Sequence, residues 1–312
     1  MTAAFDLTGA HRAPFRWRLL APRHWPSWVA VALLRGSLYL PLAMRARIAR
    51  VLGRLYYRGN AKRRRIAAIN IALCFPDWSA ERQARAVREH FRLAALALFH
   101  MAVLWWGDER MIDCCLRVTG LEHYETARAA GRRVIVLHCH CVGLEASLAL
   151  SRYFPYVGFV KPMKDPVLDF VMTRGRERFG GRVFAREAGI RALVRAVKAG
   201  YGASYVPDED LGPKESVYAP FFGVQAATLP TLGRLARMTD AVVIPCFTRL
   251  LARGGCELWL EPPIAGFPTG SGAGDAAAMN ATIEQAVLKM PEQYLWTMKR
   301  FKTRDDGVSP YD

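Results

Sequence analysis

The chain has 312 residues, a formal net charge of +17 and a hydrophobic fraction of 52% that includes 8 tryptophans. This length is enough for one large α/β domain with appendages and does not require a second full domain. A nucleic-acid-binding protein would explain the charge but not the apolar content, whereas a protein resting on an anionic membrane explains both. The seven cysteines lack paired C-x-x-C spacing, which indicates reduced, mostly structural thiols in a protein that faces the cytosol.

The N-terminal part combines basic, aromatic and apolar residues. Residues 1–20 interleave arginines with Phe15 and Trp17, which is typical of an interfacial membrane segment. Residues 25–44 are apolar and close to the length of about 20 residues that a spanning helix needs, but Arg35 and Pro41 interrupt them. A membrane span, a shallow or re-entrant helix and a buried core helix all remain open for this stretch.

A dense basic run follows the apolar stretch. Its apolar residues have helical spacing, so it is predicted to be an amphipathic helix whose cations contact anionic head groups, although a solvated helix face would have the same pattern. Under the positive-inside rule this side faces the cytoplasm. We therefore assign residues 1–65 to a membrane-associated helical segment and residues 66–312 to an α/β domain. The cations of the run are Arg45, Arg47, Arg50, Arg54, Arg58, Lys62, Arg63, Arg64 and Arg65.

Beyond residue 66, predicted helices and strands alternate. Helices are expected at 66–75, after Ser79 and through 91–106, and then at 146–153, 165–179, 189–199, 231–238 and 279–290. Strands are expected at 134–137, 156–160, 182–184, 203–206, 241–247 and 256–260, with a compact loop at 219–223. The helix at 91–106 is apolar on nearly all sides, so it is either core or one wall of an acyl-chain groove. This order predicts an α/β fold with a largely parallel sheet flanked by helices.

Polar residues follow the predicted buried strand at 134–137. His140 and Glu145 lie in the loop and first turn after it, at the carboxyl edge of the sheet where α/β proteins place their chemistry. Residues five apart on one helix point about 140° apart, so His140 must lie outside the helix for the two side chains to meet.

This pair predicts acid–base chemistry. Glu145 would accept a hydrogen bond from one ring nitrogen of His140, and the other nitrogen would act as a general base on a substrate hydroxyl. A loop pair without chemistry is the alternative for so short a pattern. Cys139, His140 and Cys141 do not form a metal site in this prediction, because no second ligand pair is present, and no cofactor is expected.

Several longer motifs resemble those of the lipid A late acyltransferases, the lauroyl and myristoyl transferases of Gram-negative outer-membrane biogenesis. The resemblance covers nearly the whole chain and is much more specific than the His–Glu pair. The motifs are H-x4-E at His140, KPMKDPVLD at 161–169, RGRERFG at 174–180, VPDEDLGPK at 206–214, PFFG at 220–223, PEQYLW at 291–296 and RFKTR at 300–304.

The resemblance implies a glycerol-3-phosphate-acyltransferase-like fold on the cytoplasmic face of the inner membrane. It implies transfer of a fatty acyl group, lauroyl or myristoyl, from acyl carrier protein to a hydroxyl of a Kdo-bearing lipid A precursor. His140 and Glu145 fall on the family's catalytic pair, Arg176 on or next to its motif arginine, and Asp208 on its second acidic position.

The roles of these residues follow from the implied chemistry. His140 would be the base, Glu145 its orienting group, and Arg176 would stabilise an oxyanion or contact a phosphate while Asp208 holds that arginine. Basic residues near the motifs are candidate contacts for lipid phosphates or Kdo carboxylates, with a solvated surface role as the alternative. These candidates are Lys164, Arg174, Lys214, Arg300 and Lys302.

Some residues depart from the family pattern. Cys141 follows His140 where the family more often has a bulky group, Thr297 and Met298 replace a Leu-His pair, and His138 is an additional histidine. The acyl length and the acceptor hydroxyl are left open by these changes. Two alternatives to the lipid A reaction also remain, namely acyl transfer to a glycerolipid or other glycolipid and a non-catalytic basic protein that binds membranes; nucleic acid is not expected as a partner.

Overall fold

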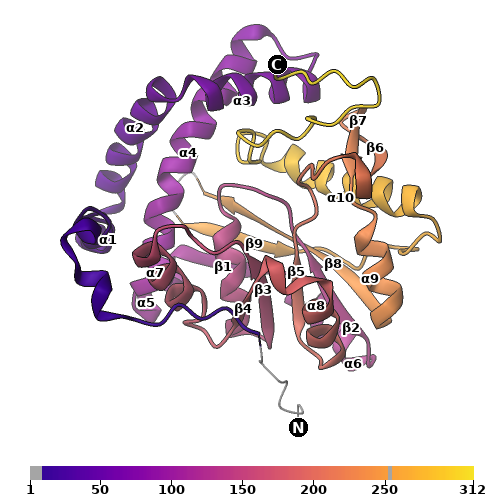
Figure 1. Ribbon diagram of the computed structural model, residues 1–312, viewed down its shortest axis with the longest axis horizontal. Helices are drawn as coiled ribbons and strands as arrows, with labels where there is room; N and C mark the ends of the chain where they lie inside the picture. Colours follow the sequence, from indigo (N-terminus) through magenta and orange to yellow (C-terminus); the bar gives the residue numbers. More distant parts are fainter. Residues whose placement is uncertain (1–8, 252–254) are drawn as a thin grey trace.

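The computed structural model describes residues 9–251 and 255–312. Part of the predicted interfacial segment, residues 1–8, lies outside the described residues. The fold is a seven-stranded sheet with helices on both faces and additional helices at the N-terminal side (Figure 1). The strand order is β1-β9-β8-β2-β5-β3-β4. The strands are β1 (Leu116–Thr119), β2 (Arg133–Leu137), β3 (Tyr156–Val160), β4 (Arg182–Ala185), β5 (Gly202–Tyr205), β8 (Ala241–Leu250) and β9 (Cys256–Leu260).

The sheet is mostly parallel, as predicted. Its neighbouring strands pair in parallel except β8 and β9, which are antiparallel because they are consecutive in the chain and joined by a short connection. Strand β2 lies near the middle, between β8 and β5, and its residues Val134 to Leu137 are at most 2% exposed. Its continuous apolar run is what a strand covered on both faces requires.

Two hydrophobic cores lie on opposite faces of the sheet. Alternate residues of β2 contribute to each: Ile135 and Leu137 pack in one core, and Val134 and Val136 in the other. The first core includes residues of α3 (Ala61–Cys74), α8 (Gly189–Lys198), α9 (Thr231–Thr239) and α10 (Gly272–Lys289). The second includes residues of α6 (Leu121–Ala129), η4 (Leu144–Arg152), α7 (Pro166–Arg176) and the end of α4 (Ala80–Trp106).

The apolar stretch at 25–44 is not one helix. Helix α1 (Trp25–Gly36) ends, a short 3-10 turn (Ser37–Tyr39) follows, and α2 (Leu42–Gly59) begins after Pro41. Arg45, predicted to contact lipid head groups, is instead buried and donates to the carbonyls of Leu38 and Leu40 within this break. Within the described part of the chain, no helix is both long and apolar enough to cross a membrane.

Helices α2 and α4 pack closely through small residues. Ala49 is fully buried, and a Cβ atom placed on Gly53 would lie 2.7 Å from the Arg92 Cα of α4. Small side chains at these two positions therefore let the two backbones approach each other. The proposed boundary between residues 65 and 66 lies inside helix α3, and the division of the chain into two parts stays a prediction.

Three local predictions were wrong or incomplete. Residues 219–223 are not a loop but part of a hairpin of β6 (Val217–Phe221) and β7 (Val224–Thr228). Its two turn residues, Phe222 and Gly223, have φ values of 51° and 73°, as a tight hairpin turn requires, and Pro220 obscured the strand pattern. Residues 144–152 form a 3-10 helix instead of an α-helix, and β1, α6 and the short helix α5 (Glu109–Cys115) were not predicted.

Candidate active site

The parallel pairing of β2 with β5 brings His140 and Asp208 together. In the sheet register Leu137 lies opposite Tyr205, so the third residue beyond each strand is His140 on one side and Asp208 on the other. The His138 amide donates to the Tyr205 carbonyl and extends this register past the strand ends. Both side chains therefore lie at the carboxyl edge of the sheet, where open α/β sheets bind their ligands.

Asp208 fixes His140 through both of its carboxylate oxygens. The backbone amide of His140 donates to Oδ2 at 2.8 Å, and the ring nitrogen Nδ1 lies 2.7 Å from Oδ1. Asp208 is fully buried, whereas the His140 side chain keeps 27% of its surface exposed. An ionised carboxylate only accepts hydrogen bonds, so Nδ1 carries a proton and, in the neutral ring, Nε2 carries the free lone pair.

The two groups shift each other's pKa in opposite directions. Burial alone would lower the pKa of His140, but the charge of Asp208 and its hydrogen bond outweigh burial and raise it above the usual value for histidine. Burial would likewise raise the pKa of Asp208, but His140 outweighs it and lowers this pKa. The pair is therefore a carboxylate beside an imidazole of increased basicity, which is the arrangement that a general base needs.

Glu145 does not hold His140. Its carboxylate accepts two hydrogen bonds from Arg176, from Nε at 2.8 Å and from Nη2 at 2.9 Å, and both side chains are about 15% exposed or less. This contradicts the predicted hydrogen bond between His140 and Glu145, and also the prediction that Asp208 holds the arginine. The partners are exchanged because Glu145 lies in the first turn of η4, where it meets Arg176 at the end of α7, whereas Asp208 follows β5 and reaches His140 directly.

A C-terminal segment fixes the loop that carries His140. The Leu295 amide donates to the His140 carbonyl at 2.9 Å, and the Val142 amide donates to the Gln293 carbonyl at 2.9 Å. The Gln293 side chain in turn bonds both backbone groups of Leu250 at the end of β8. The PEQYLW motif thus acts as a short antiparallel partner of the loop, which restricts the position of the imidazole.

His138 has a structural role behind the site. It is 1% exposed, its Nδ1 lies 2.6 Å from the Cys246 carbonyl, and its Nε2 lies 2.6 Å from the Tyr156 hydroxyl. A carbonyl can only accept, so Nδ1 donates to it and the Tyr156 hydroxyl donates to Nε2. Burial lowers the pKa of His138 to about 4, so the ring stays neutral and joins the end of β2 to its neighbour β8 and, beyond β5, to β3.

The cysteines beside His140 belong to the core. Cys139 and Cys141 are 1% and 7% exposed, and all seven cysteines are free thiols, as the sequence predicted. The Cys141 sulfur lies 3.0 Å from the Thr248 hydroxyl, which gives it a local partner. Among the residues that the structure describes, no group of three or more His, Cys, Asp or Glu side chains could hold a metal ion.

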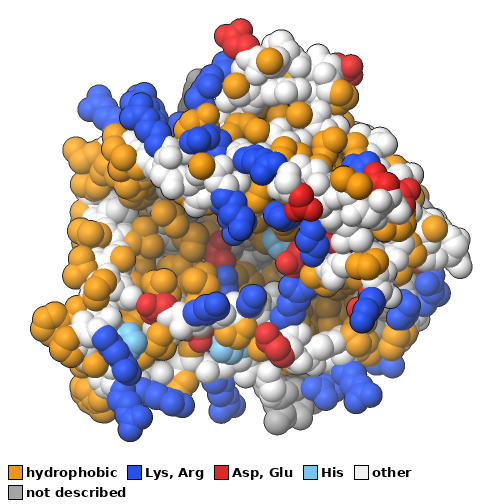
Figure 2. Space-filling model, turned by 45° about the horizontal axis from the view of Figure 1, so that its top comes forward, with side chains coloured by type: hydrophobic (Ala, Val, Ile, Leu, Met, Phe, Trp, Pro, Cys, Tyr) orange, Lys and Arg blue, Asp and Glu red, His pale blue; other side chains and the backbone are white. Residues whose placement is uncertain are grey.

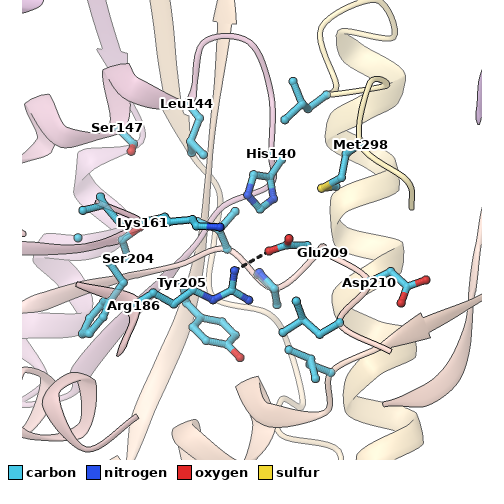
Figure 3. A pocket seen from close by; sticks show the side chains of 18 of the residues that line it. His140, Leu144, Ser147, Lys161, Arg186, Ser204, Tyr205, Glu209, Asp210 and Met298 are labelled. Carbon is cyan, nitrogen blue, oxygen red and sulfur yellow. Dashed lines mark hydrogen bonds and ion pairs between the residues drawn. The ribbon is translucent and has the colours of Figure 1, made fainter. Parts of the chain in front are cut away.

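His140 opens into a cavity of about 850 Å³. Figure 2 shows the molecule hollowed between the N-terminal helices and the sheet edge, with a histidine and acidic side chains inside the hollow. In Figure 3 the His140 ring and the Lys161 side chain extend into the same space, and Arg186 pairs with Glu209 across from them at 2.7 Å. Apolar side chains complete the lining, among them Leu144, Leu148, Phe159, Ile190 and Leu193. A cavity of this size and mixed lining suits a substrate with an apolar and an anionic part.

Of the predicted site residues, five lie at the cavity, three are exposed away from it, and Arg300 is buried elsewhere. His140, Glu145, Arg176 and Lys302 line the cavity, and Asp208 lies directly behind His140. Lys164, Arg174 and Lys214 are exposed but are not part of the cavity lining, and Arg174 instead lies over the Phe170 ring.

Arg300 contradicts its predicted role as a substrate contact. It is fully buried, donates to the Ala227 carbonyl, Thr228 Oγ1 and Asn280 Oδ1, and lies over the Phe221 ring. A guanidinium with these partners joins the β6–β7 hairpin to α10 and has no surface left for a ligand. Its charge in the motif indicated a lipid contact, but its burial could not be predicted from the sequence.

Four further basic residues, which the sequence analysis did not predict as site residues, also line the cavity. They are Arg63 from α3, Lys161 after β3, Arg186 after β4 and Lys299 near the C-terminus. Arg63 donates to the Thr297 carbonyl, which places it beside the C-terminal segment. Of these four, Lys161 could have been predicted from the sequence, because it directly follows a predicted strand that ends at the same sheet edge as the strand before His140.

Comparisons with known proteins identify the family of this chain. The family model described as bacterial lipid A biosynthesis acyltransferase matches residues 12–303. The chain is 33% identical to a lipid A biosynthesis lauroyltransferase of Escherichia coli, over 94% of this chain and 97% of that protein, and 35% identical to an E. coli lipid A biosynthesis myristoyltransferase, over 93% and 91%. A lipid A biosynthesis acyltransferase of Haemophilus influenzae is 32% identical, over 97% and 95%. The chain belongs to the bacterial lipid A biosynthesis acyltransferase family and is an acyltransferase of lipid A biosynthesis.

Proposed function

We propose that this protein transfers a lauroyl or myristoyl group from acyl carrier protein to a hydroxyl of a Kdo-bearing lipid A precursor, with His140 as the general base. The observation that carries this proposal is the His140–Asp208 pair, whose free ring nitrogen opens into a large cavity with a basic and apolar lining. The activities for which three E. coli relatives are named, lauroyl, myristoyl and palmitoleoyl transfer, support an acyl chain of medium or long length.

The reaction requires one proton to move twice. Nε2 of His140 removes the proton of the acceptor hydroxyl as its oxygen attacks the thioester carbon, and Asp208 stabilises the imidazolium that forms. The tetrahedral intermediate then collapses, the C–S bond breaks, and the imidazolium returns the proton to the departing thiolate. An ester and a free thiol result, and His140 is neutral again.

Arg176 is the proposed stabiliser of the oxyanion or of a substrate phosphate. Glu145 accepts hydrogen bonds from its Nε and Nη2, which leaves Nη1 without a hydrogen bond to any residue in 9–251 or 255–312. Burial lowers the pKa of Arg176, but the Glu145 carboxylate outweighs burial and raises it, so the group stays charged. Glu145 is thus the orienting group of the arginine, and negative charge that develops on the substrate carbonyl would meet a fixed cation.

We also propose that the protein works at the cytoplasmic face of the inner membrane, as a glycerol-3-phosphate-acyltransferase-like fold with a membrane-associated N-terminal segment. Exposed apolar side chains on α1 and α2 support this placement, among them Trp25, Val29, Leu33 and Leu55, each more than half exposed. The basic cavity residues Lys161, Arg186, Lys299 and Lys302 support an acceptor that carries phosphate or carboxylate groups.

The direct test is acyl transfer with defined substrates. The purified protein is incubated with a mixed membrane lipid fraction, a Kdo-bearing lipid A precursor and acyl carrier protein that carries labelled laurate or myristate. The expected result is label on the lipid A precursor with a mass gain of one acyl group, and no label with His140→Gln. Label only in phospholipid would instead favour the glycerolipid acceptor and contradict the proposal.

A further inference from the structure

A second cavity, of about 780 Å³, lies between α2 and the first half of α4, with a lining that does not overlap that of the active-site cavity. It is strongly basic: seven arginines and only two glutamates, Glu89 and Glu292, line it. So many like charges in one cleft repel one another unless an anion lies among them. The arginines are Arg50, Arg54, Arg58, Arg82, Arg85, Arg88 and Arg92.

The helix packing creates this concentration of charge. Arg50, Arg54 and Arg58 are four residues apart and therefore share one face of α2. Gly53, between them, allows the close approach to Arg92 on α4, and both Gly53 and Arg92 line the cavity. The arginines of the two helices consequently face one shared cleft, which a bulkier residue at position 53 would force apart.

Several of these arginines are not neutralised by the protein. Arg92 pairs with Glu89, Arg85 pairs with Glu81, and the Arg82 guanidinium lies 3.9 Å from the Trp78 ring centroid. The other four have no carboxylate partner among the residues that the structure describes. They are Arg50, Arg54, Arg58 and Arg88. The cleft therefore offers free guanidinium groups, which bind phosphate oxygens well because their N–H groups form a planar fork.

The surface beside the cleft is apolar. On α2, Val51 and Leu55 are 54% and 59% exposed, and Leu52 and Tyr56 are about 40% exposed. Figure 2 shows hydrophobic side chains gathered along the edge formed by α1 and α2, with basic side chains at its upper end. A helix with arginines on one face and exposed apolar residues on the adjoining face is typical of an element at a lipid interface.

We propose that this arginine cleft binds the phosphate headgroup of an anionic phospholipid while the neighbouring apolar face of α2 contacts the acyl region of the bilayer. The cleft volume is in the range of sites for small molecules, which fits a headgroup better than a protein surface. The exposed apolar row beside the arginines favours a bilayer over an acidic protein, because such side chains enter the boundary between headgroups and acyl chains. The proposal does not depend on the acyl-transfer reaction, because headgroup binding is measured without turnover.

Vesicle flotation of the full-length protein tests the proposal. Wild type is mixed with phosphatidylcholine vesicles with and without phosphatidylglycerol and compared with Arg54→Ala/Arg58→Ala and with Arg54→Lys/Arg58→Lys. The control, Arg191→Ala/Arg234→Ala, removes the same charge from two exposed arginines on α8 and α9. We expect the alanine pair to bind anionic vesicles about 10- to 30-fold more weakly, the lysine pair to bind at an intermediate level, and the control to bind like wild type.

Three outcomes would overturn the proposal. Equal losses in the cleft pair and the control pair would show a general charge effect without a site. Inorganic phosphate that stabilises wild type but not the cleft pair in thermal melts, together with unchanged vesicle binding in the cleft pair, would show a site for a free anion. Unchanged vesicle binding with a raised KM for acyl carrier protein would show a docking surface for an acidic protein. Circular dichroism melting curves establish that each variant is folded.

Discussion

At the scale of single residues, His140 is the group on which the proposed chemistry depends most. Its Nδ1 is bonded to Asp208, so Nε2 is the ring nitrogen that is left to act as a base, and removal of the imidazole removes that base while the His140 backbone amide keeps its bond to Asp208. We expect His140→Gln to lower kcat by about 10²- to 10⁴-fold while the KM for the acceptor changes little. Steady-state kinetics with labelled acyl donor measure both values, and a kcat close to wild type would exclude His140 as the base.

The ion pair between Glu145 and Arg176 is expected to affect both turnover and stability. Arg176→Lys keeps the charge but cannot form the two parallel bonds to Glu145, so the cation is no longer fixed, and we expect kcat to fall about 100-fold.

Glu145→Gln leaves a mostly buried guanidinium without its charged partner and should lower the free energy of unfolding by about 1–3 kcal/mol. Denaturant titration of Glu145→Gln and wild type measures this loss of stability. A Glu145→Gln protein of wild-type stability would contradict a structural role for this pair.

At the scale of elements, the contact between α7 and α4 positions Arg176. A Cβ atom on Gly175 would lie 2.3 Å from Cδ1 of Trp105, so α7 can approach α4 only with glycine at this position. Gly175→Ala must displace the last turn of α7, which carries Arg176, and we expect a loss of about 1–3 kcal/mol in stability together with a lower kcat. The matched control is Gly36→Ala at the end of α1, where no atom lies within 4 Å of the added carbon. Thermal melts and kinetics of both variants distinguish a local clash from a general effect of alanine.

The C-terminal segment depends on α3 in a similar way. Asn70 is fully buried, donates to the carbonyls of Trp296 and Met298, and accepts a hydrogen bond from the Tyr311 hydroxyl. Asn70→Ala removes all three bonds and leaves the Trp296 carbonyl without a donor, whereas the Met298 carbonyl keeps the Arg300 amide, so we expect a loss of about 2–4 kcal/mol in the free energy of unfolding. Tyr311→Phe removes the bond to Asn70 and also the bond that the buried Phe301 amide donates to the Tyr311 hydroxyl, so we expect a loss of about 1–3 kcal/mol. Denaturant titration measures both losses, and a loss of less than about 1 kcal/mol in Asn70→Ala would contradict the central role of the Asn70 amide.

At the scale of the whole molecule, the order of the strands determines which carboxylate meets which partner. The sequence correctly predicted the strands that end before His140 and Asp208, because the first is a β-branched apolar run, the second is short and mostly apolar, and polar residues follow both. It could not predict that β5 lies beside β2, since that neighbourhood depends on long-range pairing and not on local pattern. The sequence separation of five residues therefore favoured Glu145 as the partner of His140, whereas the sheet supplies a partner 68 residues away.

Burial explains the other differences between the sequence-based site and the structure. Arg300 and Lys302 come from one motif, yet the first is fully enclosed by the hairpin and α10 while the second lines the active-site cavity. A charged residue at the end of the chain is usually exposed, so the enclosure of Arg300 was not foreseeable. The apolar stretch at 25–44 was recognised by composition, but its division at Pro41 depends on Arg45, which folds back to bond the carbonyls before the proline.

The most direct test of the central claim is the pH dependence of kcat/KM in wild type, Asp208→Asn and Glu145→Gln. A general base must be neutral, so the rate rises as the pH passes the pKa of His140, which Asp208 holds above the usual value for histidine. Loss of the Asp208 charge lowers that pKa, and we therefore predict that in Asp208→Asn the acid limb moves to lower pH while the plateau falls. We predict that in Glu145→Gln the limb stays at the wild-type position. A limb that moves in Glu145→Gln and stays in place in Asp208→Asn would contradict the pairing of His140 with Asp208 as the catalytic arrangement.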